Sequence, residues 1–233
     1  MGSDCLGLSR PAASIKYACS CKATLPRKAP MKKKSPATNR QKKILRFFGI
    51  EFSPNISAGA AGWDIGMHLS NEECSERWGK YLFLTRDFGS KSDQLMPFDY
   101  EAIDNLVVPD DWDWRRAGQE YRDNIVAEFL DEHDGSPFDR PQPEVSFAGT
   151  QFVFTGKFDL GSRKECQEAV AQRGASAPKS MTRSVDYLVI GTQGSPTWKK
   201  KGEYGRKIEA AIVSRREHGS PAILSEDHWR SFL

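Results

Sequence analysis

The stretch "QFVFTGKFDLGSRKECQEAVAQRG", residues 151–174, decides the fold of the C-terminal part of the chain. With Thr150 before it, the stretch opens on "TQFVF", which is dense in β-branched and aromatic side chains and predicts a strand. Ser162 can then cap a helix, in which apolar residues recur at helical spacing until Gly174. A strand joined so closely to a helix is typical of α/β proteins.

Strands and helices continue to alternate after this stretch. We expect, in order, a short strand at 176–180 ("SAPKS"), a buried strand at 185–191 ("VDYLVIG"), a helix at 205–219, a strand at 221–224 and a final helix that is capped by Ser225 and carries Trp229. The order βαββαβα predicts a largely parallel sheet that is covered by helices.

Charge divides the chain into three regions. Residues 1–50 carry twelve Lys and Arg against one acid, a net charge of +11. Residues 51–144 carry eight bases against twenty-one acids, a net charge of −13, and residues 145–233 carry fourteen against nine, a net charge of +5. The pattern indicates a basic tail, an acidic middle and a mildly basic C-terminal domain.

Four segments follow from these patterns. We expect a disordered basic arm at 1–38, because Pro, Lys and Ser leave little to bury, although an organelle transit peptide would have a similar composition. Residues 39–134 are expected to be mostly helical and acidic toward their end, with one helix that follows a cap at Thr38 or Asn39 and another from Trp114 to Asp131. Residues 135–144 read as a Pro-rich linker, and 145–233 as the α/β domain.

Several classes of protein are excluded by composition. The five cysteines form no C-x-x-C pair, which argues against a disulfide framework and a zinc site and indicates a reducing compartment. No stretch approaches the roughly 20 apolar residues of a membrane helix, so we expect a soluble intracellular protein with no membrane partner. The expected location is cytoplasmic or nucleoid-associated in a bacterium, and nuclear or organellar in a eukaryote. Met31 is an alternative start of the chain.

The C-terminal residues carry a family signature. The motifs are F-x-G-x-x-F-V-F-T-G, S-R-K-E-C, R-G-A-S-A, V-D-Y-L-V-I-G, G-R-K-I-E-A-A and I-L-S-E-D-H-W, in that order. With this signature, residues from about 145 to 233 resemble a BRCT domain, and most of all the type found in NAD-dependent DNA ligases and in the large subunit of replication factor C. The resemblance implies a four-stranded parallel sheet of order 2-1-3-4, with two of three helices on one face and one on the other.

The same resemblance implies a phosphate site. Thr155, Gly156 and Lys207 match the phosphate-binding Ser/Thr, Gly and Lys of the family, and Arg163 matches an arginine that helps to bind a DNA 5′-phosphate. The residue chemistry agrees, because a hydroxyl, an unhindered amide and two cations all suit a phosphate. Taken one by one, the same residues are better explained as a turn and solvated surface charges than as a phosphate site.

A basic loop precedes Lys207. The stretch "TWKKKGEYGRK" interleaves aromatic and basic residues, as nucleic-acid-binding loops do. Its candidate DNA contacts are Trp198, Lys199, Lys200, Lys201 and Arg206. A solvated loop with Trp198 packed on the domain is the alternative.

The sequence favours a binding protein over an enzyme. It contains no K-x-D-G ligase nucleophile, no nucleotide-binding P-loop and no H-E-x-x-H motif, so we expect neither catalysis nor a cofactor. The leading hypothesis is a non-catalytic adaptor of DNA replication or repair that binds a 5′-phosphate at DNA ends or nicks. The alternative is a protein-interaction module that binds a phosphopeptide or an unmodified protein partner.

Overall fold

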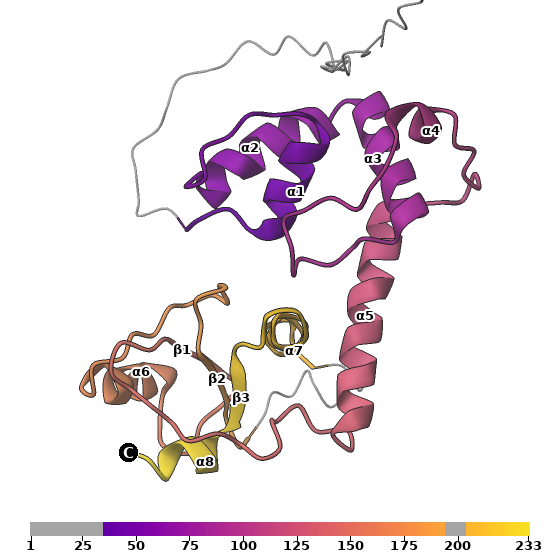
Figure 1. Ribbon diagram of the computed structural model, residues 1–233. Helices are drawn as coiled ribbons and strands as arrows, with labels where there is room; N and C mark the ends of the chain where they lie inside the picture. The colour runs from indigo at the N-terminus through magenta and orange to yellow at the C-terminus, as the bar shows by residue number, and fades with distance from the viewer. Residues whose placement is uncertain (1–34, 194–203) are drawn as a thin grey trace, which may run out of the picture. The chain divides into compact units, whose positions relative to one another are not determined.

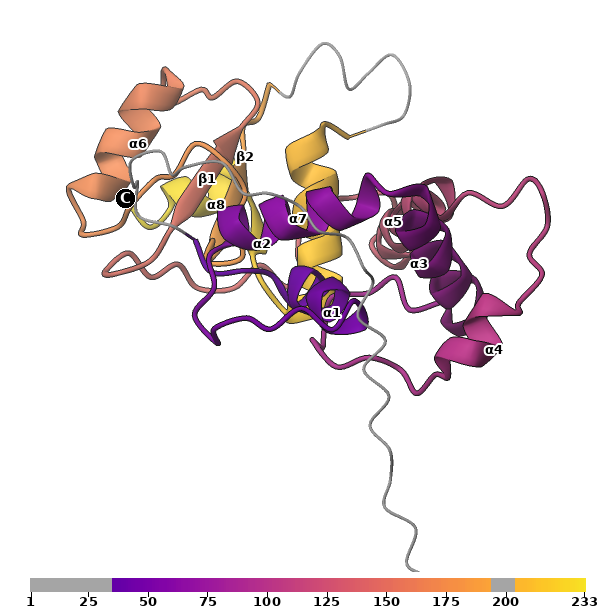
Figure 2. The ribbon, with the colours of Figure 1, turned by 90° about the horizontal axis from the view of Figure 1, so that it is seen from above.

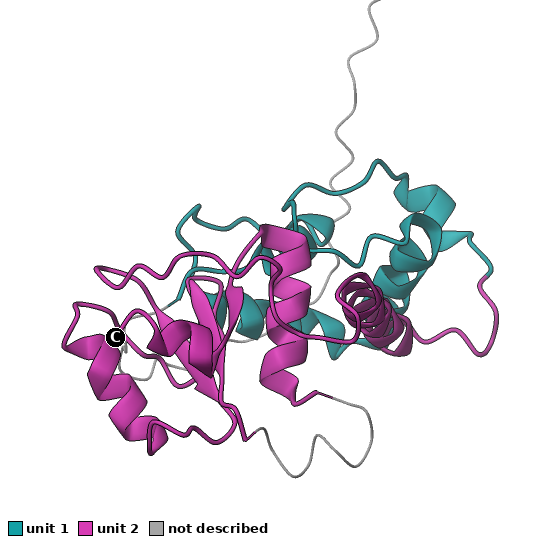
Figure 3. Ribbon diagram, turned by 90° about the horizontal axis from the view of Figure 1, so that it is seen from below, with its two compact units in different colours: residues 1–107 teal, residues 108–233 magenta. Residues whose placement is uncertain are grey.

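The computed structural model describes residues 35–193 and 204–233 of the chain (Figure 1). The chain divides into two compact units, Met1–Val107 and Val108–Leu233, which are coloured separately in Figure 3. The candidate DNA contacts Trp198, Lys199, Lys200 and Lys201 lie outside the described residues.

Unit 1, Met1–Val107, is helical in its described part. Its helices are α1 (Asn39–Phe47), α2 (Ala58–Leu69), α3 (Glu72–Thr85) and α4 (Tyr100–Asp104). Thr38 caps α1, because its hydroxyl accepts a hydrogen bond from the Gln41 amide, and the Gln41 side chain in turn accepts one from the Thr38 amide. The helical character expected for this region is confirmed.

The core of unit 1 is aromatic and contains one buried ion pair. The Phe47 ring lies 5.0 Å from the Trp78 ring and 5.1 Å from the Tyr81 ring, measured between centroids. The Lys43 ammonium group is buried and lies 2.6 Å from the Asp87 carboxylate, which also accepts a hydrogen bond from the Tyr81 hydroxyl. Burial raises the pKa of Tyr81 to about 12, so its hydroxyl remains a donor at physiological pH.

Unit 2, Val108–Leu233, is built on a parallel sheet. Its strands are β1 (Phe152–Thr155), β2 (Tyr187–Ile190) and β3 (Ala222–Ser225), which pair in the order β1-β2-β3. Its helices are α5 (Trp114–Glu132), α6 (Arg163–Ala171), α7 (Arg206–His218) and α8 (Glu226–Arg230). The predicted α/β domain with a parallel sheet is thus confirmed.

In the described residues the sheet has three strands in the order β1-β2-β3, so the predicted four strands in the order 2-1-3-4 are not found there. The segment 176–180 contributes a single bridge, in which the Ser176 amide donates to Thr150 and the Ser176 carbonyl accepts from Phe152, at 2.9 and 2.8 Å. In a parallel ladder the next donor would be the amide of residue 178. That residue is Pro178, which has no N–H, and the pairing with β1 ends there.

Helices cover both faces of this sheet. Phe152 and Phe154 of β1 pack with Cys166 of α6 and Trp229 of α8, whereas Val153 faces the core formed by α7. Figure 2 shows α6 and α7 on opposite sides of β1 and β2. The expected arrangement of two helices on one face and one on the other is therefore present, and α5 adds a further helix beside α7.

The predicted linker, 135–144, lies within unit 2 and covers the edge of β3. The Asp139 amide donates to the Ile223 carbonyl, and the Asp139 carboxylate accepts from the Ile223 amide, both at 3.0 Å. The Gln142 side chain accepts from the Ser225 amide at 2.7 Å. The prolines of this segment cannot donate to a strand, so these two side chains satisfy the strand edge instead. The compact unit that contains this segment begins at Val108.

Candidate functional site

The ends of β1 and β2 form the base of the candidate site. Thr155 ends β1 and accepts a hydrogen bond from the Gly191 amide at 2.9 Å, directly after β2. Gly156 follows with a φ of 91°, a conformation that favours glycine. A Cβ atom on Gly191 would clash with the Lys157 carbonyl, so the two loops meet only because residue 191 is glycine.

A buried carboxylate fixes these two loops. Glu226, the first residue of α8, is fully buried and accepts hydrogen bonds from the backbone amides of Asp159, Leu160 and Thr192, at 3.0, 2.8 and 3.0 Å. Burial alone would raise the pKa of Glu226, but these hydrogen bonds outweigh burial and lower it. The carboxylate is therefore ionised, and it positions the loop that carries Gly156. The sequence pattern does not reveal this role, although Glu226 belongs to the I-L-S-E-D-H-W motif.

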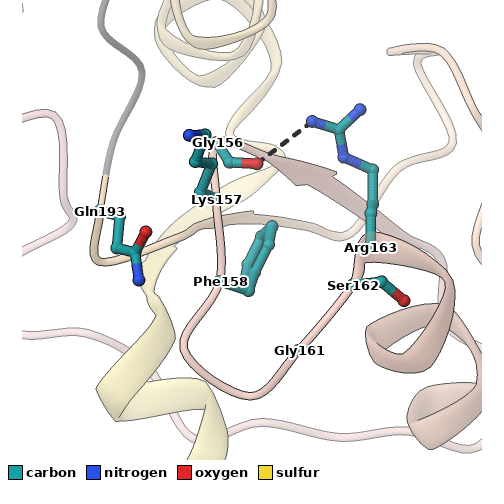
Figure 4. Close-up of a pocket in the computed structure, with 7 residues that line it drawn as sticks. All are labelled: Gly156, Lys157, Phe158, Gly161, Ser162, Arg163 and Gln193. Atoms are coloured by element: carbon teal, nitrogen blue, oxygen red, sulfur yellow. Dashed lines mark hydrogen bonds between the residues drawn. The ribbon is translucent and has the colours of Figure 1, made fainter.

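Arg163 reaches this loop from the start of α6. Ser162 caps the helix and forms a capping box with Glu165, which fixes Arg163 as the first helical residue. The Arg163 guanidinium donates a hydrogen bond to the Gly156 carbonyl at 3.2 Å. Figure 4 shows the side chain extended from α6 toward that carbonyl.

Lys207 approaches from the start of α7. It is the second residue of the helix, after Arg206, and the cap residue is Gly205, which supplies no side-chain hydrogen bond to the first turn. Partial burial lowers the pKa of Lys207, and the charge of Arg163 lowers it further. The two cations are thus close enough to repel each other.

Two cavities meet at Arg163. The first has a volume of about 390 Å³ and is shown in Figure 4; it is lined by Gly156, Lys157, Phe158, Gly161, Ser162, Arg163 and Gln193. The second has a volume of about 270 Å³ and is lined by Phe154, Arg163, Gln167, Pro178, Lys179 and Lys207. No carboxylate of a described residue lines the second cavity.

The predicted site residues are partly brought together. Arg163 contacts Gly156 and shares the second cavity with Lys207. Thr155 adjoins Gly156 in the chain but lines neither of these cavities, and Arg206 is exposed at the start of α7.

Two cavity residues are not predicted from the sequence. Lys179 and Gln167 line the second cavity, and the only signals that point toward them are a lysine after Pro178 and a polar residue one turn after Arg163. Neither signal identifies a site by itself.

The described residues offer neither a metal site nor a membrane span. Within 35–193 and 204–233, no group of three or more His, Cys, Asp and Glu side chains is placed to hold a metal ion. No helix in these ranges has both the length and the apolar character needed to span a bilayer.

Comparison with known proteins gives partial matches to DNA ligases. No family model matches the chain. The chain is 34% identical to the DNA ligase of Dehalococcoides mccartyi over 74 residues, which are 32% of this chain and 10% of the ligase. It is 24% identical to the DNA ligase of Thermoanaerobacter pseudethanolicus over 136 residues, 52% of this chain and 20% of the ligase. The DNA ligase of Halothermothrix orenii is 32% identical over 69 residues, 30% of this chain and 10% of the ligase. The chain thus matches only a tenth to a fifth of the length of these ligases.

Proposed function

We propose that this chain is a non-catalytic DNA-binding adaptor of replication or repair, whose C-terminal unit contains a BRCT domain that recognises a 5′-phosphate at DNA ends or nicks. One observation carries the proposal: Arg163 and Lys207, from two different helices, line one cavity beside the carboxyl end of β1. Ligands of open α/β sheets commonly bind at this end of the strands. The partial similarity to DNA ligases supports a DNA partner.

The sheet supports the BRCT assignment. The motifs that resemble the family fall on β1, α6, β2, α7 and β3 in the expected order. The bridge of Ser176 to Gln151 adjoins β1, where the resemblance places the remaining strand. Pro178 ends the pairing there after one residue pair.

The cations suit a phosphate better than a neutral ligand. An arginine offers two parallel N–H donors to phosphate oxygens, and a lysine adds a point charge. The charge of Arg163 disfavours the charged form of Lys207, and a bound anion would offset that effect. The proposal of a binding protein without catalysis is supported by the sequence, which contains no K-x-D-G ligase nucleophile.

The test is a fluorescence titration of the full chain with two duplexes that differ only in a 5′-phosphate or a 5′-hydroxyl, repeated at several salt concentrations. We expect the phosphorylated duplex to bind about tenfold more tightly, since charge-assisted hydrogen bonds contribute roughly 1.5–3 kcal/mol each. Arg163→Ala and Lys207→Glu should remove this difference.

Lys164→Gln is the matched control. Lys164 also lies in the first turn of α6, is exposed, and pairs with Glu168 at 3.5 Å, away from the cavities. Its substitution should weaken the binding of both duplexes slightly and by the same factor. Equal affinity of the natural protein for the two duplexes would overturn the proposal, and much tighter binding of a phosphopeptide would favour a protein-interaction module.

A further inference from the structure

A third cation lines the cavity of Arg163 and Lys207. Lys179 follows Pro178, which ends the pairing beside β1, and both residues line the cavity. The three cations come from separate parts of unit 2: Arg163 from α6, Lys207 from α7, and Lys179 from the segment between α6 and β2. Lys179 is not among the phosphate-binding residues that the family resemblance implies.

These three cations have no acidic partner among the described residues of unit 2. Among the described residues, no carboxylate lies within ion-pair distance of Arg163, Lys179 or Lys207, although ten Lys, Arg and His side chains elsewhere in the described chain form ion pairs. Three like charges around a cavity of about 270 Å³ raise the energy of the unbound protein. Partial burial lowers the pKa of Lys207, and the charge of Arg163 lowers it further. An anion with more than one charge would offset the repulsion best.

The other cavity residues complete a surface for such an anion. Gln167 lies one helical turn after Arg163 and supplies an amide that can donate to an oxygen. Phe154 and Pro178 contribute apolar atoms to the cavity wall. A phosphate monoester carries about −1.5 to −2 charges at pH 7, whereas each internal phosphodiester of DNA carries one.

We propose that Lys179 is a specificity-determining residue, which together with Arg163 and Lys207 selects the dianionic terminal phosphate of DNA over the singly charged phosphodiesters of the backbone. The inference rests on the proposed function, because it takes this cavity as the phosphate site. The inference adds that binding depends on the charge of the terminal phosphate as well as on its presence.

The experiment compares three 5′ ends on one duplex: phosphate, methyl phosphate and hydroxyl. The methyl phosphate keeps the phosphorus but carries a single charge. The full chain should bind the phosphate end about tenfold more tightly than the methyl phosphate end, as expected for one additional charge-assisted contact. In Lys179→Gln this ratio should fall to about twofold, while affinity for the hydroxyl end stays nearly unchanged.

Lys164→Gln again serves as the control. It also removes one positive charge, but from a residue of α6 that does not line the cavity, so the preference for phosphate over methyl phosphate should be unchanged. Lys179 is exposed, so its substitution should not affect folding, which circular dichroism can check.

The possible failures are distinguishable. If the natural protein does not discriminate the phosphate end from the hydroxyl end, the proposed function is wrong. If it does discriminate but Lys179→Gln retains the preference for phosphate over methyl phosphate, only the assignment of Lys179 is wrong. If a phosphoserine peptide displaces the phosphorylated duplex at lower concentration than unlabelled duplex does, the monoester belongs to a protein and the DNA assignment is overturned.

Discussion

Glu226 is buried away from solvent, yet its two carboxylate oxygens accept hydrogen bonds from both loops of the candidate site. Its pKa in the folded protein is lowered below the ordinary value of 4.5, because the hydrogen bonds outweigh the effect of burial. A carboxyl group of this kind stabilises the fold fully above pH 4.5, and the contribution disappears as pH falls through the lowered pKa. At low pH the two loops that Glu226 holds should therefore become less stable.

Glu226→Gln tests this role at the residue scale. The amide group would turn an N–H toward backbone donors, so we expect the free energy of unfolding of unit 2 to fall by about 2 kcal/mol at pH 7. Below pH 4.5 the natural protein should lose stability more steeply than the variant. Urea unfolding between pH 7 and pH 3 measures both effects.

The control is Asp227→Asn, an exposed neighbour on α8, which should change stability little. Equal stability of Glu226→Gln and the natural protein at pH 7 would contradict the assigned role.

The residues of the candidate site differ in how far the sequence reveals them. The prediction of Gly156, Arg163 and Lys207 as site residues rests on the family resemblance, and each lies next to a strand end or a helix start. Glu226 could not be predicted, because its partners lie 66 and 67 residues earlier, at Leu160 and Asp159. No local pattern marks so distant a contact.

At the scale of elements, periodicity predicts where helices form better than it predicts which elements they pack against. The helix predicted at Trp114–Asp131 is present as α5, although the sequence pattern places it in the N-terminal region. Instead, Ile125 and Phe129 join the core that α7 forms with the sheet. An apolar face shows that a helix is buried, and it does not show against which element.

Phe129→Ala tests whether α5 is an integral part of unit 2. Phe129 is 5% exposed, and its removal from the core should cost about 3–5 kcal/mol of the stability of unit 2. Hydrogen exchange at the amides of β2 and β3 should accelerate accordingly, and it measures unit 2 separately from unit 1. Asn124→Ala, on the exposed face of α5, should leave exchange unchanged. If the amides of β2 and β3 exchange as slowly in Phe129→Ala as in the natural protein, α5 is not needed for the stability of unit 2.

At the scale of the whole molecule, the sequence predicted the parallel sheet and its covering helices, since both follow from the order of elements. It did not predict where unit 2 begins. Prolines made 135–144 resemble a linker, whereas Asp139 and Gln142 bind β3 through their side chains. The proline content of a segment predicts the conformation of its backbone. It does not predict hydrogen bonds that depend on two individual side chains, as these do.

The uneven distribution of charge leads to a prediction about the N-terminal segment. Residues 1–34 carry eight Lys and Arg and one acid, so they should add phosphate contacts that do not depend on DNA ends. A chain that begins at Ser35 should therefore bind the 5′-phosphate and 5′-hydroxyl duplexes more weakly by the same factor. The logarithm of its affinity should also depend less steeply on the logarithm of salt concentration, by roughly 0.9 for each DNA phosphate that the shortened chain no longer neutralises. Because Arg163, Lys179 and Lys207 remain, the ratio between the two duplexes should be unchanged. A changed ratio would mean that the N-terminal segment takes part in reading the DNA end, and an unchanged salt dependence would mean that it does not bind DNA.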